Sequence, residues 1–438
     1  MLLAPGPPTD GLAIVKLTPT ALVVATSWAG RIISGISALL VVRPLIQGLG
    51  SSQYALYALV VSLTGWYALA DFGLSSALQN AVSERRALGR GYEGLVRGVC
   101  VLSFGLLTGV ILVFALASGP LARVYMVRFQ VDEGTKQLAL FTGSSLIATS
   151  MVGFVAFRVW FAEQRGHLAN AVPALGALVG LIAVKVWASF GGIGLLGTFL
   201  VVQGPPAAVA VLVMLWRTMR STGTRLREDL RDAQGLLRKA VGFWGIGVLA
   251  AGSLYVDSFV VSQYLSAEDI IAYNVPTRVF DAIKVFYNAV LFALWPTWTE
   301  LTAKRDLSEL GRNIRRSLQI GLISTGVVGL VAIPMMPLVV QVLAPGIEGR
   351  VSWMFVAALA TFEVIRTWTN THAIVLVSMG RLWGIPVGLV VQAALSIGLQ
   401  LLLVPRFGMI GATLGLIGSF LGGTAWIYPW LVRRLVRP

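Results

Sequence analysis

The chain is poor in the residues on which soluble enzymes depend. It has one cysteine, Cys100, and two histidines, and only 12% of its 438 residues are charged. One cysteine excludes a disulfide framework, and two histidines exclude a metal centre built from histidine. The sequence has no GxxxxGK[ST] phosphate loop, and its Ser, His and Asp residues lack the spacing of a nucleophilic triad. These absences predict a protein that is not an enzyme and that carries no metal or cofactor.

Apolar residues dominate what is present. They make up 56% of the chain, with a mean hydropathy of +0.81, whereas soluble domains usually carry about 25% charged residues. The apolar residues fall in blocks of roughly 20, the helix length that crosses a bilayer core of about 30 Å. We predict an all-α polytopic membrane protein. The twelve expected spans cover residues 21–43, 54–80, 97–119, 137–161, 168–190, 194–216, 241–264, 270–297, 317–340, 352–378, 383–404 and 411–432.

The basic residues are distributed unevenly between the two faces that these spans define. The net charge is +15, from 34 Lys and Arg against 19 Asp and Glu. Most basic residues lie on one face, in the runs 85–97, 217–239, 312–316 and 433–437. By the positive-inside rule this face is cytoplasmic and holds both termini. The positive charge therefore indicates topology and attraction to anionic membrane lipid, and we expect no binding of nucleic acid.

The basic segment near the midpoint suggests an internal repeat. The sequence GLLGTFL at 194–200 recurs as GLIGSFL at 415–421. We predict an N-terminal six-helix lobe (1–217), a cytoplasmic linker (218–240) and a C-terminal six-helix lobe (241–438). Because six is an even number, both lobes start on the same side, and the pseudo-twofold axis of this parallel repeat follows the membrane normal. Such lobes face each other across a central cleft, which fits alternating access better than a channel.

Charged residues within the spans are the best indicators of function, because a charge at the bilayer centre costs at least about 2.5–3.5 kcal/mol. Arg43, Lys185 and Arg158 lie near span ends, where their long side chains can reach the headgroups. Arg31 lies deep in the first span. The eighth span carries a stripe on one helical face, formed by Asn274, Arg278, Asp281, Lys284 and Asn288. The tenth carries Glu363, Arg366 and Asn370 on one face.

Two interpretations of these residues stay open. In the first interpretation the residues bind a phosphate-bearing substrate, because arginine binds phosphate oxygens in pairs. The predicted contacts of this substrate are Arg31, Asn274, Arg278, Lys284, Arg366 and Asn370. Acidic residues in the spans are candidates for binding a coupling H+ or Na+; they are Asp71, Asp257, Asp281 and Glu363. The other is ion pairing of Arg278 with Asp281 and of Glu363 with Arg366 at i, i+3 spacing. That pairing leaves Arg31 and Lys284 without a local partner. Candidates for stacking on sugar rings are Trp28, Trp66, Trp295, Trp298 and Trp368.

Two segments resemble Wzx-type polysaccharide flippases. Residues 48–89 contain Asp71-Phe72-Gly73-Leu74, then Asn80 and a basic loop, as the early region of that family does. Residues 291–306 place a Trp-Pro pair before an acidic residue, as at the end of the family's eighth span. The resemblance implies membership of the multidrug/oligosaccharidyl-lipid/polysaccharide exporter superfamily. It implies a flippase of the bacterial inner membrane that moves undecaprenyl-pyrophosphate-linked oligosaccharide, such as O-antigen, capsule or exopolysaccharide repeat units, to the outer leaflet.

The same resemblance implies a cationic central cavity for the pyrophosphate-sugar headgroup and an ion gradient as the driving force. The expected partners are the lipid-linked oligosaccharide, membrane lipids and other polysaccharide-assembly proteins. The lipid II flippases of the superfamily carry extra helices that this chain lacks. The alternative is an ion-coupled multidrug or metabolite antiporter of the same superfamily, which would need no lipid carrier. A membrane-embedded glycosyltransferase would need a larger polar loop than any in this sequence.

Overall fold

The computed structural model describes residues 19–163, 165–189, 194–220, 225–379 and 384–436, which are almost entirely helical and contain no strand. The first half contains α1 (Pro19–Leu40), α2 (Val42–Ser62), α3 (Thr64–Tyr67), the 3-10 helix η1 (Ala68–Asp71), α4 (Leu74–Ala87), α5 (Glu93–Tyr125), α6 (Glu133–Ala162), α7 (Gly166–Ser189) and α8 (Leu195–Arg220). The second half contains α9 (Leu226–Gln234), α10 (Leu237–Leu254), α11 (Val256–Tyr264), α12 (Ala267–Ala303), α13 (Leu307–Leu343), the 3-10 helix η2 (Glu348–Arg350), α14 (Trp353–Ser378), α15 (Gly384–Leu421) and α16 (Thr424–Val436).

Eight stretches of the described residues are long and apolar enough to cross a membrane. Two of them, Trp28–Asp71 and Ile385–Leu435, have 44 and 51 residues, about twice the length that one crossing needs. Their helical paths are interrupted at Gly50 and Gly408, where φ is 72° and 57°. The helices α12 and α14 are not among the eight, and they carry the charged stripes. The all-α polytopic architecture is confirmed, and the number of twelve spans stays a prediction.

The expected second span, 54–80, is wrong as a single helix. The chain breaks between α2 and α4, where Phe72 and Gly73 adopt left-handed conformations with φ of 49° and 77°. The Asp71 carboxylate accepts hydrogen bonds from the backbone N–H groups of Gly73 (2.8 Å) and Ser75 (3.2 Å), and from the Ser75 hydroxyl. These bonds satisfy donors at the start of α4. A side chain at Gly73 would collide with the backbone of Ala240 in α10, so the close approach of α4 and α10 needs glycine.

A second break lies opposite the first. Tyr255 separates α10 from α11 with φ −124° and ψ 10°, which leaves its carbonyl outside a regular helix. The Trp66 indole of α3 donates a hydrogen bond to this carbonyl at 3.1 Å. Close by, the Trp244 ring of α10 stacks on Phe72 with centroids 5.3 Å apart, and its indole donates to the Leu69 carbonyl at 3.1 Å. Side chains thus satisfy the backbone groups that the breaks expose, as an apolar surrounding requires.

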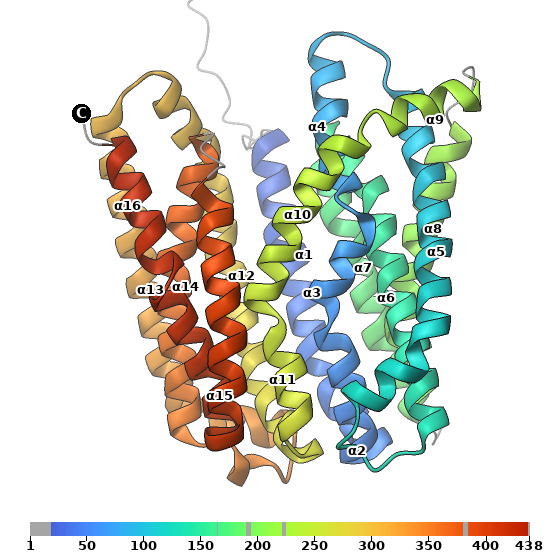
Figure 1. Ribbon diagram of the computed structural model, residues 1–438, viewed down its shortest axis with the longest axis vertical. Coiled ribbons are helices and arrows are strands. Elements are labelled where there is room, and N and C mark those ends of the chain that lie inside the picture. Colours follow the sequence, from blue (N-terminus) through green and yellow to red (C-terminus); the bar gives the residue numbers. More distant parts are fainter. Residues whose placement is uncertain (1–18, 164, 190–193, 221–224, 380–383, 437–438) are drawn as a thin grey trace, which may run out of the picture.

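The helices of the two halves pack in the same pattern. The helix pair α5 and α6 corresponds to α13 and α14, the pair α4 and α6 to α12 and α14, and the packing of α1 on α7 to that of α10 and α11 on α15. Figure 1 shows the helices as two bundles, which meet in the middle of the view where α1, α3, α10 and α11 lie. This arrangement is the two-lobe repeat that the recurring GLLGTFL and GLIGSFL segments predict. The expected linker, residues 218–240, is largely helical. It contains the end of α8, which runs to Arg220, the whole of α9 and the start of α10, which begins at Leu237.

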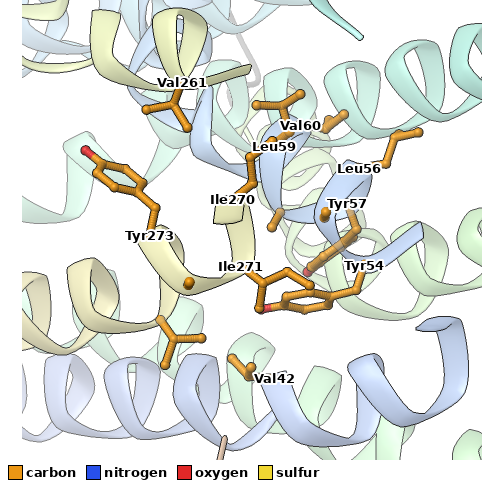
Figure 2. Packing of buried hydrophobic residues seen from close by; sticks show 14 of the residues in the cluster. Val42, Tyr54, Leu56, Tyr57, Leu59, Val60, Val261, Ile270, Ile271 and Tyr273 are labelled. Carbon is orange, nitrogen blue, oxygen red and sulfur yellow. The ribbon is translucent and has the colours of Figure 1, made fainter. Parts of the chain in front are cut away.

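One hydrophobic core of the described residues is shared extensively by the two lobes, and it lies at one end. That core joins residues 41–60 and 122–147 of the first half to residues 260–280 and 336–360 of the second. Figure 2 shows its centre, where Tyr54 and Tyr57 of α2 lie near Ile270 and Ile271 of α12. At the end that carries α4, α9 and α16, the described buried residues form separate clusters. One lies around α4 to α6 and includes Ala240 of α10, and the other lies around α12, α13, α14 and α16. The lobes are therefore packed together most extensively at the end away from the basic segments.

The helix α9 is held against the first lobe. Arg97 and Arg85 form ion pairs with Asp229 and Asp232 of α9 at 3.6 and 2.9 Å. Gly98 of α5 lies under α9 so closely that an added Cβ would collide with the Asp229 backbone. The segment between the lobes is thus anchored to the first lobe.

We expect Gly98→Val to displace α9, because overpacking a close contact costs about 1–3 kcal/mol. Trypsin should then cleave the arginine-rich segment 225–239 roughly tenfold faster, or more, than in the unchanged protein. The cleavage rate follows the fraction of molecules in which α9 has separated from the first lobe. The matched control is Gly105→Val on the same helix, where an added Cβ meets nothing within 4 Å. Equal cleavage rates in the two variants would contradict the anchoring of α9.

Candidate functional site

Four charged side chains of α12 and α14 form one connected group, which we call the charge network. Lys284 forms an ion pair with Asp281 one turn away on α12. Arg366 of α14 lies 3.6 Å from the Asp281 carboxylate and 3.3 Å from that of Glu363. The network therefore links the two helices that carry the predicted stripes. Two positive groups and two negative groups balance each other, as buried charges require.

The network is closed on one side and open on the other. The Glu363 side chain is only 6% exposed and that of Arg366 is 17% exposed, whereas that of Asp281 is 47% exposed. Arg366 also lies over the Phe362 ring, 5.6 Å from its centroid. A ligand would therefore reach the two cations from the Asp281 side. An anion there could replace Asp281 as the partner of Lys284 and Arg366.

The structure decides between the pairings left open by the sequence. Glu363 and Arg366 pair as the i, i+3 spacing predicts. Among the described residues Arg278 forms no ion pair; its Nε lies 3.4 Å from the Asn274 side-chain oxygen. The expected Arg278–Asp281 pair is therefore wrong, and so is the expectation that Lys284 lacks a local partner. Arg278 and Lys284 each lie three residues from Asp281 on α12, on opposite sides of it, and only Lys284 forms the ion pair.

Uncharged groups extend the polar surface between α12 and α14. The Asn370 amide donates to the Asn288 side-chain oxygen at 2.5 Å, and the Tyr287 and Thr371 hydroxyls lie 2.8 Å apart. Asn288 belongs to the predicted stripe but not to the predicted substrate contacts, and its bond to Asn370 places both side chains together. The two helices thus meet along a polar seam that includes the charge network.

The remaining predicted site residues have different surroundings. Asp257 is buried and accepts a hydrogen bond from the Tyr273 hydroxyl at 2.6 Å, within electrostatic reach of Arg366. Asp71 belongs to the other lobe and caps α4, so its oxygens are already occupied. The side chain of Arg31 lies outside the described residues, although its backbone is part of α1. The predicted acidic residues are therefore not gathered at one point.

Two buried tyrosines of α2 were not predicted from the sequence. Tyr54 and Tyr57 are almost completely buried, and α2 packs against α12, the helix that carries Arg278. The Tyr54 hydroxyl has no hydrogen-bond partner among the described residues. The available signal was a pair of hydroxyl-bearing aromatics at i, i+3 spacing in an otherwise apolar segment. They bring the first lobe into contact with the α12 stripe.

Three of the tryptophans proposed for sugar stacking have structural contacts instead. Trp298 is fully buried, and the indoles of Trp66 and Trp368 donate to the backbone carbonyls of Tyr255 and Ala425 at 3.1 and 2.9 Å. A fully buried ring offers no face to a sugar, so the expectation for Trp298 is wrong. Trp66 and Trp368 hold helix ends and breaks in place.

No protein-family model matches the sequence. Curated relatives nevertheless align with nearly the whole chain. A "Putative O-antigen export protein" of Yersinia pseudotuberculosis is 29% identical over 423 residues, covering 95% of this chain and 97% of the relative. A "Putative O-antigen transporter" of Salmonella typhi is 28% identical over 420 residues, with the same coverage. The resemblance predicted from residues 48–89 and 291–306 is confirmed by these relatives.

Solved structures of the multidrug/oligosaccharidyl-lipid/polysaccharide exporter superfamily share the fold. An inward-facing multidrug transporter of this superfamily matches with a TM-score of 0.74 at 15% identity, covering 94% of this chain and 98% of the other. A lipid II flippase in an inward closed conformation matches with a TM-score of 0.73 at 11% identity, covering 94% and 87%. The two-lobe transporter fold is thus established for this chain.

We expect Glu363→Gln to destabilise the protein. The substitution removes one partner of Arg366 at a buried position. Leaving a buried charge unpaired typically lowers the free energy of unfolding by about 3–5 kcal/mol. Because Asp281 still pairs with Arg366, we expect a loss at or below the lower end of this range. The matched control is Asp269→Asn, whose pair with Arg350 is exposed at both side chains and contributes about 0–1 kcal/mol. Thermal unfolding in detergent measures both. An unfolding midpoint of Glu363→Gln no lower than that of Asp269→Asn would contradict the structural importance of the charge network.

Proposed function

We propose that this protein is a flippase of the bacterial inner membrane. It moves a lipid-linked oligosaccharide of the O-antigen type from the cytoplasmic to the outer leaflet. The observation that carries the proposal is a pair of cations, Lys284 and Arg366, held in a network that opens through Asp281 within a two-lobe transporter fold. The relatives named for O-antigen export support the same substrate class. We assign transport, not catalysis, to the chain.

The charge network suits a pyrophosphate. Arg366 and Lys284 can exchange the Asp281 carboxylate for phosphate oxygens, which accept charge-assisted hydrogen bonds of similar geometry. Arg278, which has no ion pair among the described residues, is available to the same anion from the same face of α12. Glu363 stays with Arg366 and keeps its guanidinium oriented. The lipid tail remains in the bilayer while the headgroup passes between the lobes.

The packing of the lobes supports access from the cytoplasmic side. With the termini and basic segments in the cytoplasm, the shared core around Tyr54 and Ile271 closes the outer end. At the cytoplasmic end α10 packs against the cluster around α4 to α6, but the core around α12, α13, α14 and α16 is separate from it, which allows those helices to part from the first lobe there. Release to the outer leaflet then requires the shared core to open, so substrate binding has to stabilise that second arrangement.

We further propose that a proton or Na+ gradient drives the cycle. Asp257 and Glu363 are the strongest candidates for binding the ion, because each is a buried carboxylate, and a buried carboxylate is costly to leave charged without a bound cation or proton. Asp71 is a weaker candidate, since hydrogen bonds from Gly73 and Ser75 already occupy it. Other polysaccharide-assembly proteins are the expected partners at the membrane.

A multidrug or metabolite antiporter is the second candidate. The exposed Asp281 carboxylate favours it, because an organic cation could pair there. An antiporter of this kind would need no lipid-linked substrate. Its acidic residues, not its arginines, would determine affinity.

We expect Arg31→Ala, Arg278→Ala and Arg366→Ala each to abolish transport while the protein still inserts in the membrane. A hydrogen bond to a charged group contributes about 1.5–3 kcal/mol to the binding free energy, so its loss corresponds to roughly 10–100-fold weaker substrate binding. Arg315→Ala, at an exposed position of α13, is the control. Native mass spectrometry of retained polyprenyl-pyrophosphate oligosaccharide and complementation of O-antigen display measure the effects.

Normal transport in all three variants would overturn the site assignment. Retention of bulk phospholipid only, with a stabilising shift from organic cations that Asp281→Asn removes, would favour the antiporter. Substrate binding and O-antigen display are measured separately. A wrong assignment of the binding residues can therefore be distinguished from a wrong assignment of the substrate.

A further inference from the structure

A cavity of about 290 Å³ lies outside the space between the lobes, at the cytoplasmic ends of α4, α5, α6 and α8. Its charged lining consists of Arg86, Glu93, Glu163, Arg165, Arg217 and Arg220. Four arginines face two glutamates, so the cavity carries an excess of positive charge. Figure 1 shows α5, α8 and α9 at the outer edge of the first lobe, away from α12 and α14. The cavity is therefore separate from the charge network.

Part of the lining is structural. Arg217 of α8 donates two hydrogen bonds of 2.8 Å to the Glu163 carboxylate at the end of α6, and the Tyr92 hydroxyl donates to the same group at 3.2 Å. Burial raises the pKa of Glu163, but these hydrogen bonds and the Arg217 charge outweigh burial and hold the pKa below its usual range. Glu163 is therefore ionised at neutral pH and occupied by Arg217. Arg86 donates to the Ala162 carbonyl.

The other arginines supply the excess. Among the described residues, Arg165 and Arg220 form no ion pair, and both are exposed. Arg220 lies over the Trp216 ring, 5.2 Å from its centroid, which holds its guanidinium at the cavity. Guanidinium groups of this kind bind phosphate oxygens in pairs. The cavity is thus built for an anion with several oxygens.

An apolar stripe continues from the cavity along α8. Leu212, Trp216 and Met219 recur at i, i+4 and i+7, so they share one helical face. Their exposed fractions are 62%, 39% and 71%. In a helix that crosses the membrane this face contacts acyl chains, and a tryptophan at its end is typical of the headgroup level. A phosphate bound at Arg165 and Arg220 would therefore lie directly above lipid tails.

We infer that this cavity binds the phosphate of an anionic phospholipid from the cytoplasmic leaflet, with the acyl chains along Leu212. The site does not depend on the transported substrate, and it stands whether or not the proposed flippase activity holds. A lipid bound there joins the ends of α6 and α8 to the bilayer surface. The first lobe is thereby held at a defined height in the membrane.

The test compares two double variants of the full chain with equal loss of charge. Arg165→Gln with Arg220→Gln alters the cavity, whereas Arg315→Gln with Arg316→Gln removes two exposed arginines of α13. Native mass spectrometry measures retention of phosphatidylglycerol, with phosphatidylcholine as the zwitterionic reference. Two basic residues near a lipid phosphate account for about a tenfold preference or more. Neither arginine of the first variant holds an ion pair, so its thermal unfolding midpoint should match that of the control.

We expect phosphatidylglycerol binding to fall about tenfold or more in the cavity variant only. Equal retention by the two variants would overturn the site. Competition by millimolar inorganic phosphate as effective as that by phosphatidylglycerol would identify a free anion as the occupant and overturn the lipid assignment. Displacement by an acidic peptide but not by lipid would overturn it in favour of a protein partner.

Discussion

A charged group in an apolar bundle must either find a partner or reach water, and the middle of this molecule is organised by that constraint. Lys284, Arg366, Asp281 and Glu363 neutralise one another across α12 and α14. The charged faces of these helices cannot contact lipid, because placing one charge at the bilayer centre costs at least about 2.5–3.5 kcal/mol. The charged faces of α12 and α14 are therefore turned toward each other and not toward lipid. The chemistry offered to a ligand follows as well, since only an anion can replace Asp281 without leaving two cations unpaired.

The same constraint applies to the backbone. The chain breaks at 63–73 and at Tyr255, and each break exposes polar groups within the membrane. The Trp66 indole joins the two breaks by donating to the Tyr255 carbonyl, and the Trp244 indole of α10 donates to the Leu69 carbonyl within the first break. The helix α10 therefore contacts the first lobe through these bonds and the second through Ser253, whose hydroxyl donates to the Leu389 carbonyl at 3.2 Å. Irregular backbone of this kind is typical of transporters, where broken helices line the path between two lobes.

The basic residues at the end that carries α4, α9 and α16 serve more than one purpose. Arg85 and Arg97 hold α9 against the first lobe, and Arg217 joins α8 to α6 through Glu163. Arg165 and Arg220 remain free of ion pairs among the described residues and face a cavity beside the lipid-exposed side of α8. The same basic residues thus hold the segment between the lobes in place and form the proposed anion site beside α8.

The architecture and the polar helix faces were accessible from the sequence, because both depend on short-range periodicity. Runs of about 20 apolar residues predict spans, and the helical repeat alone places Asn274, Arg278, Asp281, Lys284 and Asn288 on one face. The partners of these residues were not accessible. Arg278 and Lys284 are equally spaced from Asp281, and only the packing of α12 against α2 and α14 decides that Lys284 pairs with it while Arg278 lies beside Asn274. The break at Gly73 and the cavity between four helices also depend on contacts between residues far apart in the chain. A helix determines which side chains share a face, but the packing of the lobes determines what each face meets.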